Sequence, residues 1–148
     1  MRVIFLILIG FSSLSFAEFS RQNGVVTDSS PKLEWQDDYG DNGEDLTNMT
    51  WQDAIGYCKD LSLDGGGWRV PNIRELESLI KDYSNPSINS IFELTSLHRY
   101  WSTTVYDNSP DGAYVVNFRF KLHTRPVGYS FKDKNNYVRC VRGKVLEL

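Results

Sequence analysis

The side chains best suited to covalent chemistry in this chain are its only two cysteines, Cys58 and Cys140. A metal site would need more sulfur ligands, or histidines at ligand spacing, and His98 and His123 do not provide that spacing. A disulfide is therefore favoured over a metal site or a reactive thiol, and two cysteines allow one intramolecular pairing. The bridge would close a long stretch of chain, for which loop-entropy models give about 4–5 kcal/mol of stabilisation.

Other signatures of catalysis are absent from the sequence. There is no G-x-S-x-G, H-E-x-x-H or P-loop motif, and the glycines at 65–67 lack the lysine of a phosphate loop. Glu75 and Glu77 face different sides of a predicted helix, so they make a poor acid–base pair. The sequence therefore predicts a protein that is not an enzyme and that carries no cofactor.

An acidic stretch over residues 37–45 contains enough oxygen atoms to bind calcium. It fits no EF-hand register, because Tyr39 occupies a position where a ligand is required. A solvated acidic loop is favoured over a calcium site, and no metal is predicted.

A basic segment near the C-terminus is the remaining candidate for a functional surface. Eight basic residues and one acidic residue, Asp133, lie in residues 113–144. Arginine and lysine suit sulfate or phosphate groups, and aromatic rings suit sugar faces or protein contacts. The alternative is that these are ordinary solvated charges. The candidate ligand-binding residues are Arg119, Lys121, Arg125, Tyr129, Lys132 and Lys134.

Two helices are predicted to position these residues. Thr50 and Asp53 form an approximate capping box for a helix that runs from residue 51 to about 62. Helical spacing puts Cys58 on its buried face. A second helix, capped by Asn72 with Glu75, is predicted to extend to about residue 82.

Short strands are predicted on both sides of the helices. They cover residues 25–28, 32–36, 100–106, 113–120 and 136–142. The last two are expected to form a hairpin-like set around the basic loop, and alternation puts Val138 and Cys140 on one face. The last strand could pair with the N-terminal strands. This order indicates an α+β domain in which two helices pack on a small antiparallel sheet, with the N- and C-terminal strands close together.

Four short motifs occur in a fixed order along this layout. They read W-x-x-A-x-x-Y-C at 51–58, W-R-V-P-N-x-x-E-L at 68–76, Y-W-S-T at 100–103 and V-R-C-V-R at 138–142. Together they resemble the Lcl C-terminal domain family, a bacterial family named for a collagen-like surface adhesin. Val70, Asn72 and Thr103 depart mildly from the family pattern, and Asn is as good an N-cap as Thr.

The resemblance implies a C-type-lectin-like fold, because residues 69–75 also look like a segment of formylglycine-generating enzymes. It implies a disulfide from the first helix to the last strand, in agreement with the cysteine argument. For the adhesin it implies binding of sulfated or otherwise anionic polysaccharide. The shared motif residues are interpreted as structural, so no binding residue is carried over.

The first residues of the chain are typical of a secretory signal peptide. Arg2 is followed by an apolar run over residues 3–14 and by S-F-A at 15–17, the charge, apolar segment and cleavage site of such a signal. A transmembrane anchor is disfavoured, because the run is shorter than the roughly 20 residues that a bilayer requires. Residues 1–17 are thus predicted to be removed, leaving a single domain at 18–148 with no membrane span.

The predicted function is that of an exported, non-enzymatic, lectin-like binding domain in the periplasm or at the cell surface. It would act in adhesion or bind an anionic polysaccharide at the envelope. The alternatives are an envelope structural or assembly protein that binds another protein, and, least favoured, an enzyme like the formylglycine-generating group. The net charge of −3 argues against nucleic acid as a partner.

Overall fold

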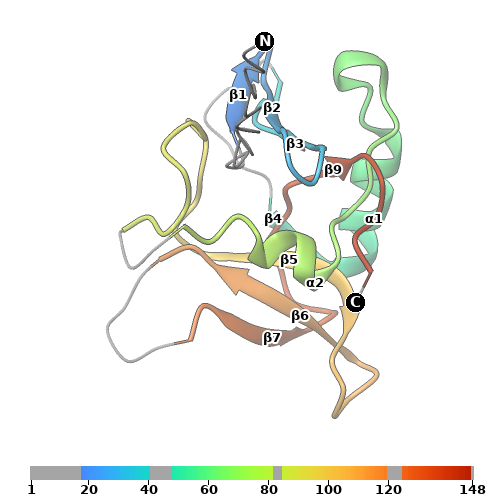
Figure 1. The fold of residues 1–148 in the computed structure, drawn as a ribbon. Coiled ribbons are helices and arrows are strands. Elements are labelled where there is room, and N and C mark those ends of the chain that lie inside the picture. The colour runs from blue at the N-terminus through green and yellow to red at the C-terminus, as the bar shows by residue number, and fades with distance from the viewer. Residues whose placement is uncertain (1–17, 41–47, 82–84, 120–124, 148) are drawn as a thin grey trace, which may run out of the picture.

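The computed structural model describes residues 18–40, 48–81, 85–119 and 125–147, and its fold is α+β (Figure 1). Two β-sheets lie one above the other in this view, with α1 beside them and α2 in front. The predicted signal peptide at 1–17, Lys121, His123 and most of the acidic stretch lie outside the described residues. Neither helix in the described ranges is long and apolar enough to cross a bilayer.

The first sheet brings the two ends of the domain together. Its order is β1 (Phe19–Gln22), β2 (Val25–Asp28), β3 (Leu33–Gln36) and β9 (Val141–Arg142), and every neighbouring pair is antiparallel. Trp35 of β3 lies opposite Val141 of β9, which confirms the predicted pairing of the last strand with the N-terminal strands. β1 was not predicted, because its side chains alternate only between half-buried and exposed and give a weak apolar pattern.

The second sheet holds the remaining strands. Its order is β4 (Asn48–Met49), β8 (Asn136–Tyr137), β5 (Arg99–Val105), β6 (Gly112–Asn117) and β7 (Val127–Phe131). β5 and β8 meet in a parallel contact, and the other pairs are antiparallel. The hairpin partner of β6 is therefore β7, a strand inside the segment predicted as a basic loop, and that prediction was wrong.

The predicted strand at 136–142 is also wrong as a single element. It divides into β8 in one sheet and β9 in the other, and Val138, Arg139 and Cys140 join them. All three of these side chains are buried, where alternation would have exposed Arg139. The chain is passing from one sheet to the other here, so both of its sides face protein.

The first helix, α1 (Trp51–Asp60), is close to its predicted bounds. Thr50 caps it, and its side chain accepts a hydrogen bond from the backbone N–H of Asp53. The helix ends before a 3-10 turn, η1 (Leu63–Gly65), and a run of glycines. The glycines at 65–67 have φ angles of 88°, 80° and 82°, a conformation that side chains disfavour. The helix was predicted to end at these glycines, but it already ends at Asp60, where Leu61 is extended, and the glycines lie beyond it.

The second helix, α2 (Ile73–Glu77), is shorter than predicted. Its capping box is complete, since Asn72 accepts from the backbone N–H of Glu75 and the Glu75 carboxylate accepts from that of Asn72. Beyond the helix, Ile80 forms an isolated β-bridge with Ile88 instead of a further turn. Leu76 and Leu79 are buried here, and a longer helix would bury them as well, so the apolar spacing could not locate the helix end.

The Glu75 carboxylate makes this part of the fold sensitive to acid. Burial acts to raise its pKa, but hydrogen bonds from Arg69 and from the amides of Asn72 and Leu146 outweigh burial and hold the pKa below its ordinary value of 4.5. A depressed pKa contributes stability that is fully present above about pH 4.5 and is lost as the pH falls through the folded value.

We expect Glu75→Gln to lower the free energy of unfolding by about 1–3 kcal/mol at neutral pH, because hydrogen bonds to a charged acceptor are lost. Denaturant unfolding at several pH values should show this deficit shrinking below pH 4.5, as the native carboxylate becomes protonated. Glu77→Gln, on the exposed side of α2, is the matched control and should show no such dependence. A deficit that is constant with pH would contradict this role.

A disulfide between Cys58 of α1 and Cys140 ties the helix to the segment between the sheets. The two Cα atoms are 5.5 Å apart and the residues are separated by 82 positions. The predicted bridge is thus confirmed in the fold. Around it lies one of two apolar clusters, and the other lies between the first sheet, α2 and the opposite face of β5 and β6.

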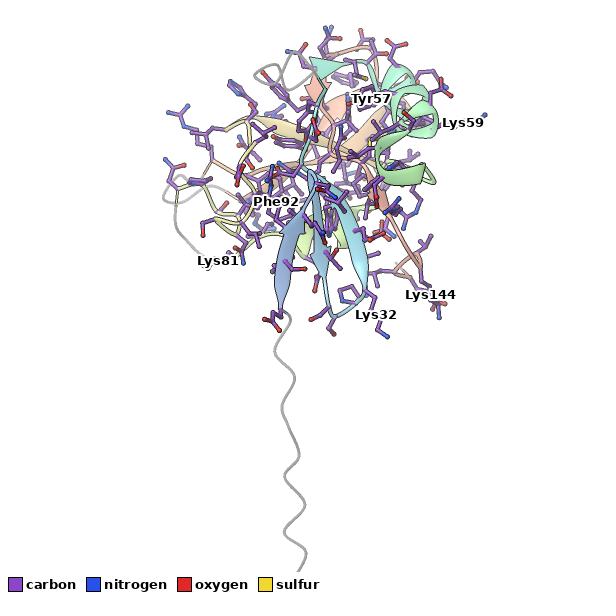
Figure 2. The ribbon with its side chains drawn as sticks, turned by 90° about the horizontal axis from the view of Figure 1, so that it is seen from above. Lys32, Tyr57, Lys59, Lys81, Phe92 and Lys144 are labelled. Atoms are coloured by element: carbon purple, nitrogen blue, oxygen red, sulfur yellow. A yellow bond between two sulfur atoms is a disulfide. The ribbon has the colours of Figure 1, made fainter. Side chains whose placement is uncertain are left out.

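The outside of the domain carries dispersed positive charge. Figure 2 shows Lys32, Lys59, Lys81 and Lys144 at separate places on the outline of the molecule. Lys59 lies on the outer side of α1, away from both sheets. These lysines form no single basic surface.

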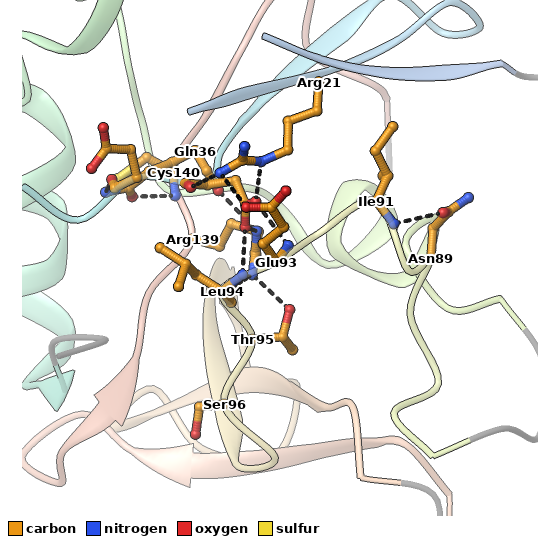
Figure 3. Close-up of polar contacts among 12 residues, drawn as sticks. Arg21, Gln36, Asn89, Ile91, Glu93, Leu94, Thr95, Ser96, Arg139 and Cys140 are labelled. Atoms are coloured by element: carbon orange, nitrogen blue, oxygen red, sulfur yellow. Dashed lines mark hydrogen bonds and ion pairs between the residues drawn. The ribbon is translucent and has the colours of Figure 1, made fainter. Parts of the chain in front are cut away.

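Arg139 and Asp37 are charged residues that, like Glu75, are fully inaccessible to solvent. Arg139 Nη1 lies 2.9 Å from Asp37 Oδ1 and also donates to the backbone carbonyl of Gln36 (Figure 3). The backbone amides of Glu93 and Leu94 donate to the same carboxylate. Asp37 was predicted to lie in a solvated acidic loop. For this residue the prediction was wrong, because Asp37 is buried between the sheets and neutralises an arginine.

Candidate functional site

The structure divides the candidate ligand-binding residues between two places. Arg119 follows β6 and Arg125 precedes β7, so both lie at the end of the hairpin where Val116 faces Val127. Lys132 and Lys134 follow the other end of β7. The described basic residues therefore do not converge on one surface.

Several of these residues are already engaged with other groups. The ammonium of Lys132 donates to the carbonyl of Pro110 and lies 4.4 Å from the centroid of the Trp51 ring. Lys134 pairs with the neighbouring Asp133. Together with Asp111 and Phe131 they line a shallow depression that contains as many carboxylates as ammonium groups. A strongly anionic ligand gains little net attraction there.

A second depression, which the sequence did not predict, lies across one end of the second sheet. Its volume is about 300 Å³. Register brings its walls together, because Asn48 of β4 faces Tyr137 of β8, while Arg99 of β5 faces Asn117 of β6. We call it the asparagine pocket, and its lining residues are Asn48, His98, Arg99, Asn117, Asn135, Asn136 and Tyr137.

The asparagine pocket is rich in groups that both donate and accept hydrogen bonds. Four of its seven lining residues are asparagines, and each primary amide offers two N–H donors and one carbonyl acceptor. Asn136 donates to Ser130, and Asn117 accepts from the backbone N–H of Arg119. In the described part of the chain, the side chains of Asn48 and Asn135 have no such partner. They are therefore available to a ligand.

The charge and the aromatic surface of the asparagine pocket are also distinctive. Arg99 lines it and is exposed, and none of the lining residues is acidic. The rings of His98 and Tyr137 lie with their centroids 5.7 Å apart. Arg119 is close by, since its amide is bonded to the Asn117 side chain. The pocket thus combines positive charge, amides and ring surface.

No group of three or more His, Cys, Asp or Glu residues that could hold a metal ion occurs within the described ranges. Neither cysteine is free. The described residues of the acidic stretch are 37–40, and Asp37 among them is already bound by arginines.

Comparison with known families agrees with this architecture. The model of the Lcl C-terminal domain matches residues 24–142, most of the chain. The chain belongs to the Lcl C-terminal domain family. A search of the curated proteins finds no significant match.

The motif residues of this Lcl C-terminal domain build the fold. The indole N–H groups of Trp51, Trp68 and Trp101 donate to the backbone carbonyls of Ser102, Leu63 and Met49. Trp68 and Trp101 are buried and Trp51 is partly buried against the same apolar cluster, and each fastens a neighbouring segment. This agrees with the interpretation of the motifs as structural.

The two motif arginines next to these segments are also structural. Arg69 makes two hydrogen bonds of 2.7 Å to the buried Glu75 carboxylate. Arg142 pairs with Glu34 of the first sheet and with Asp64 beyond α1. These contacts leave no motif guanidinium free for a ligand in the described structure.

Most of the asparagine pocket consists of residues that come directly before a motif. His98 and Arg99 precede the motif at 100–103, residues 135–137 precede the motif at 138–142, and Asn48 lies three positions before Trp51. The motifs of the Lcl C-terminal domain therefore position the pocket while leaving its chemistry to neighbouring residues. Polar residues beside each motif were the signal that could have located it.

Proposed function

We propose that this Lcl C-terminal domain is an exported, non-enzymatic binding domain that takes an anionic saccharide in the asparagine pocket. The observation that carries the proposal is the convergence of four asparagines and Arg99 from separate strands, with no carboxylate among the lining residues. Sugar hydroxyls both donate and accept hydrogen bonds, as primary amides do. A guanidinium suits the sulfate or carboxylate of an acidic sugar.

The size and the rings of the asparagine pocket support the same ligand class. Its volume of about 300 Å³ is at the lower end of the range for small-molecule sites. It therefore suits a short segment of a polysaccharide rather than a large cofactor. The rings of His98 and Tyr137 offer apolar surface to the C–H face of a sugar.

Two further observations support export and a binding role. Disulfides persist in oxidising compartments, and the Cys58–Cys140 bridge is in keeping with the predicted signal peptide at 1–17. Formylglycine-type oxidation relies on cysteine chemistry, and both cysteines of this chain are held in that bridge. The lectin-like character of the domain rests on the resemblance and on the saccharide chemistry of the pocket.

Binding of sulfated oligosaccharides, measured by calorimetry, tests this proposal. We expect Arg99→Ala to weaken binding about tenfold or more, because a charge-assisted hydrogen bond is worth about 1.5–3 kcal/mol. We expect Asn135→Ala to weaken binding less, since a neutral amide is lost. Both side chains are exposed, so folding should be unchanged.

Lys59→Ala is the matched control, because it also removes one positive charge but lies on the outer side of α1 (Figure 2). It should leave the affinity unchanged. A loss on Lys132→Ala together with full binding by Arg99→Ala would place the ligand in the shallow depression and contradict the proposal. Equal weakening by Lys59→Ala and Arg99→Ala would mean that binding depends on net charge alone.

A further inference from the structure

A histidine lines the asparagine pocket and is held in a defined position there. His98 comes directly before β5, and its side chain is exposed. Its Nδ1 atom lies 2.8 Å from the hydroxyl oxygen of Ser96, and its ring centroid lies 5.7 Å from that of the Tyr137 ring. Ser96 is held in turn, because its backbone N–H donates to the Tyr100 hydroxyl. The imidazole is therefore positioned in advance of a ligand.

The contact with Ser96 leaves the other ring nitrogen of His98 available. Within the described ranges, Nε2 forms no hydrogen bond. A serine hydroxyl can donate to Nδ1 of a neutral imidazole or accept from Nδ1–H of a protonated one. The contact can therefore persist when the ring gains a proton. The protonated ring then offers a ligand both an Nε2–H donor and a positive charge.

The surroundings of His98 contain no carboxylate among the described lining residues that would balance this charge. The other lining residues are Arg99 of β5, Asn136 and Tyr137 of β8, Asn48 of β4, Asn117 of β6, and Asn135 before β8. Tyrosine hydroxyls carry no charge at or below about pH 8, and amides never do. A proton on His98 thus adds a second positive charge beside Arg99, and the described walls of the pocket supply no negative one.

We propose that His98 is a proton-dependent contact of the asparagine pocket, so that the pocket binds its anionic saccharide more tightly in mildly acidic than in mildly alkaline surroundings. This regulation rests on the proposed function of the pocket, whose ligand it assumes. Arg99 provides a positive charge at every physiological pH. His98 provides one that depends on pH, and the sulfate or carboxylate of the ligand balances both.

Linkage between proton and ligand binding gives the direction of the effect. Histidine is the side chain that ordinarily gains a proton between about pH 8 and pH 5. If the protonated pocket binds the anion more tightly, the bound anion must favour protonation by the same factor, because the two equilibria are reciprocal. A sulfate group stays charged over this whole range. A change in affinity for a sulfated ligand therefore reports the protein and not the ligand.

Calorimetry with a sulfated oligosaccharide at about pH 8 and about pH 5.5 tests this regulation, and the ratio of the two affinities is the readout. We expect wild type to bind about five- to tenfold more tightly at the lower pH, because a charge-assisted hydrogen bond is gained there. Both values lie above the range in which Glu75 loses its stabilising charge. An uncharged oligosaccharide should show no such ratio.

Three variants assign the ratio to one side chain. His98→Gln keeps hydrogen-bonding atoms but gains no proton, so its two affinities should be equal. His98→Lys is charged at both pH values, so it should bind more tightly than His98→Gln at about pH 8 and also show a ratio near one. His123→Gln makes the same change at the only other histidine of the sequence and should keep the wild-type ratio.

Calorimetry in two buffers of different ionisation enthalpy counts the protons exchanged on binding. At about pH 6.5 wild type should take up protons as the sulfated ligand binds, and His98→Gln should not. Binding with equal affinity at both pH values, or a ratio that survives in His98→Gln, would overturn this regulation and leave the pocket as the binding site. Absence of binding at either pH would contradict the proposed function and, with it, the role of His98.

Discussion

Replacing Arg139 with methionine is expected to lower the free energy of unfolding by about 3–5 kcal/mol, a large share of the stability of a single domain. Arg139 is fully buried and binds Asp37, the Gln36 carbonyl and the Thr95 hydroxyl. Without it the equally buried carboxylate of Asp37 keeps the half-buried Arg21, 2.8 Å away, but loses its fully buried positive partner. Removing one partner of a buried ion pair is strongly destabilising, because the remaining buried charge is less well compensated.

The Arg139→Met substitution should also destabilise the segment that the Arg139–Asp37 pair holds in place. The amides of Glu93 and Leu94 donate to Asp37, and the Leu94 carbonyl accepts from Arg139 (Figure 3). Hydrogen exchange should therefore increase at these amides in Arg139→Met more than at the strands of the second sheet.

A double-mutant cycle distinguishes the charge effect from lost packing. Arg139→Met combined with Asp37→Leu removes both charges, and buried ion pairs replaced by apolar groups are often nearly neutral in stability. We expect chemical denaturation to show the double variant as more stable than Arg139→Met alone. Additive losses would indicate that other contacts of Arg139, such as that of its guanidinium with the Phe92 ring, are the important part.

Removing the disulfide is expected to have the second large effect, a decrease of about 4–5 kcal/mol in the free energy of unfolding. The bridge spans 82 positions, so its loss frees a large part of the chain in the unfolded state. It also releases α1 from the segment that runs between the two sheets. Cys58→Ala with Cys140→Ala is the appropriate variant, because it leaves no unpaired thiol.

Unfolding in guanidinium with and without reductant measures this effect. Wild type should lose stability on reduction, whereas the double alanine variant should be insensitive to reductant and already less stable. Equal unfolding midpoints for oxidised and reduced wild type would contradict a stabilising role. Mass measurement after thiol alkylation provides the accompanying check that the bridge is formed in the purified protein.

Local interactions explain which elements were predicted well. α1 begins directly after Thr50 and α2 directly after Asn72, because each cap satisfies backbone amides within three residues. The bounds of β2 and β3 follow from a short apolar alternation and a turn. The strand β7 was missed because a glycine and flanking charges weaken its apolar pattern, and because it lies at the edge of the sheet, where one backbone side remains unpaired.

The amino-acid sequence alone was enough to predict the caps, the cysteine pairing, the α+β class and the family suggested by the motifs. The caps and motifs depend on residues close in sequence, and two cysteines allow only one intramolecular pairing. Two features became visible only in the folded chain: Asp37 neutralises Arg139, 102 positions away, and asparagines distant in sequence share one pocket. Strand register and the path between the two sheets set these contacts, and local residue spacing encodes neither of them.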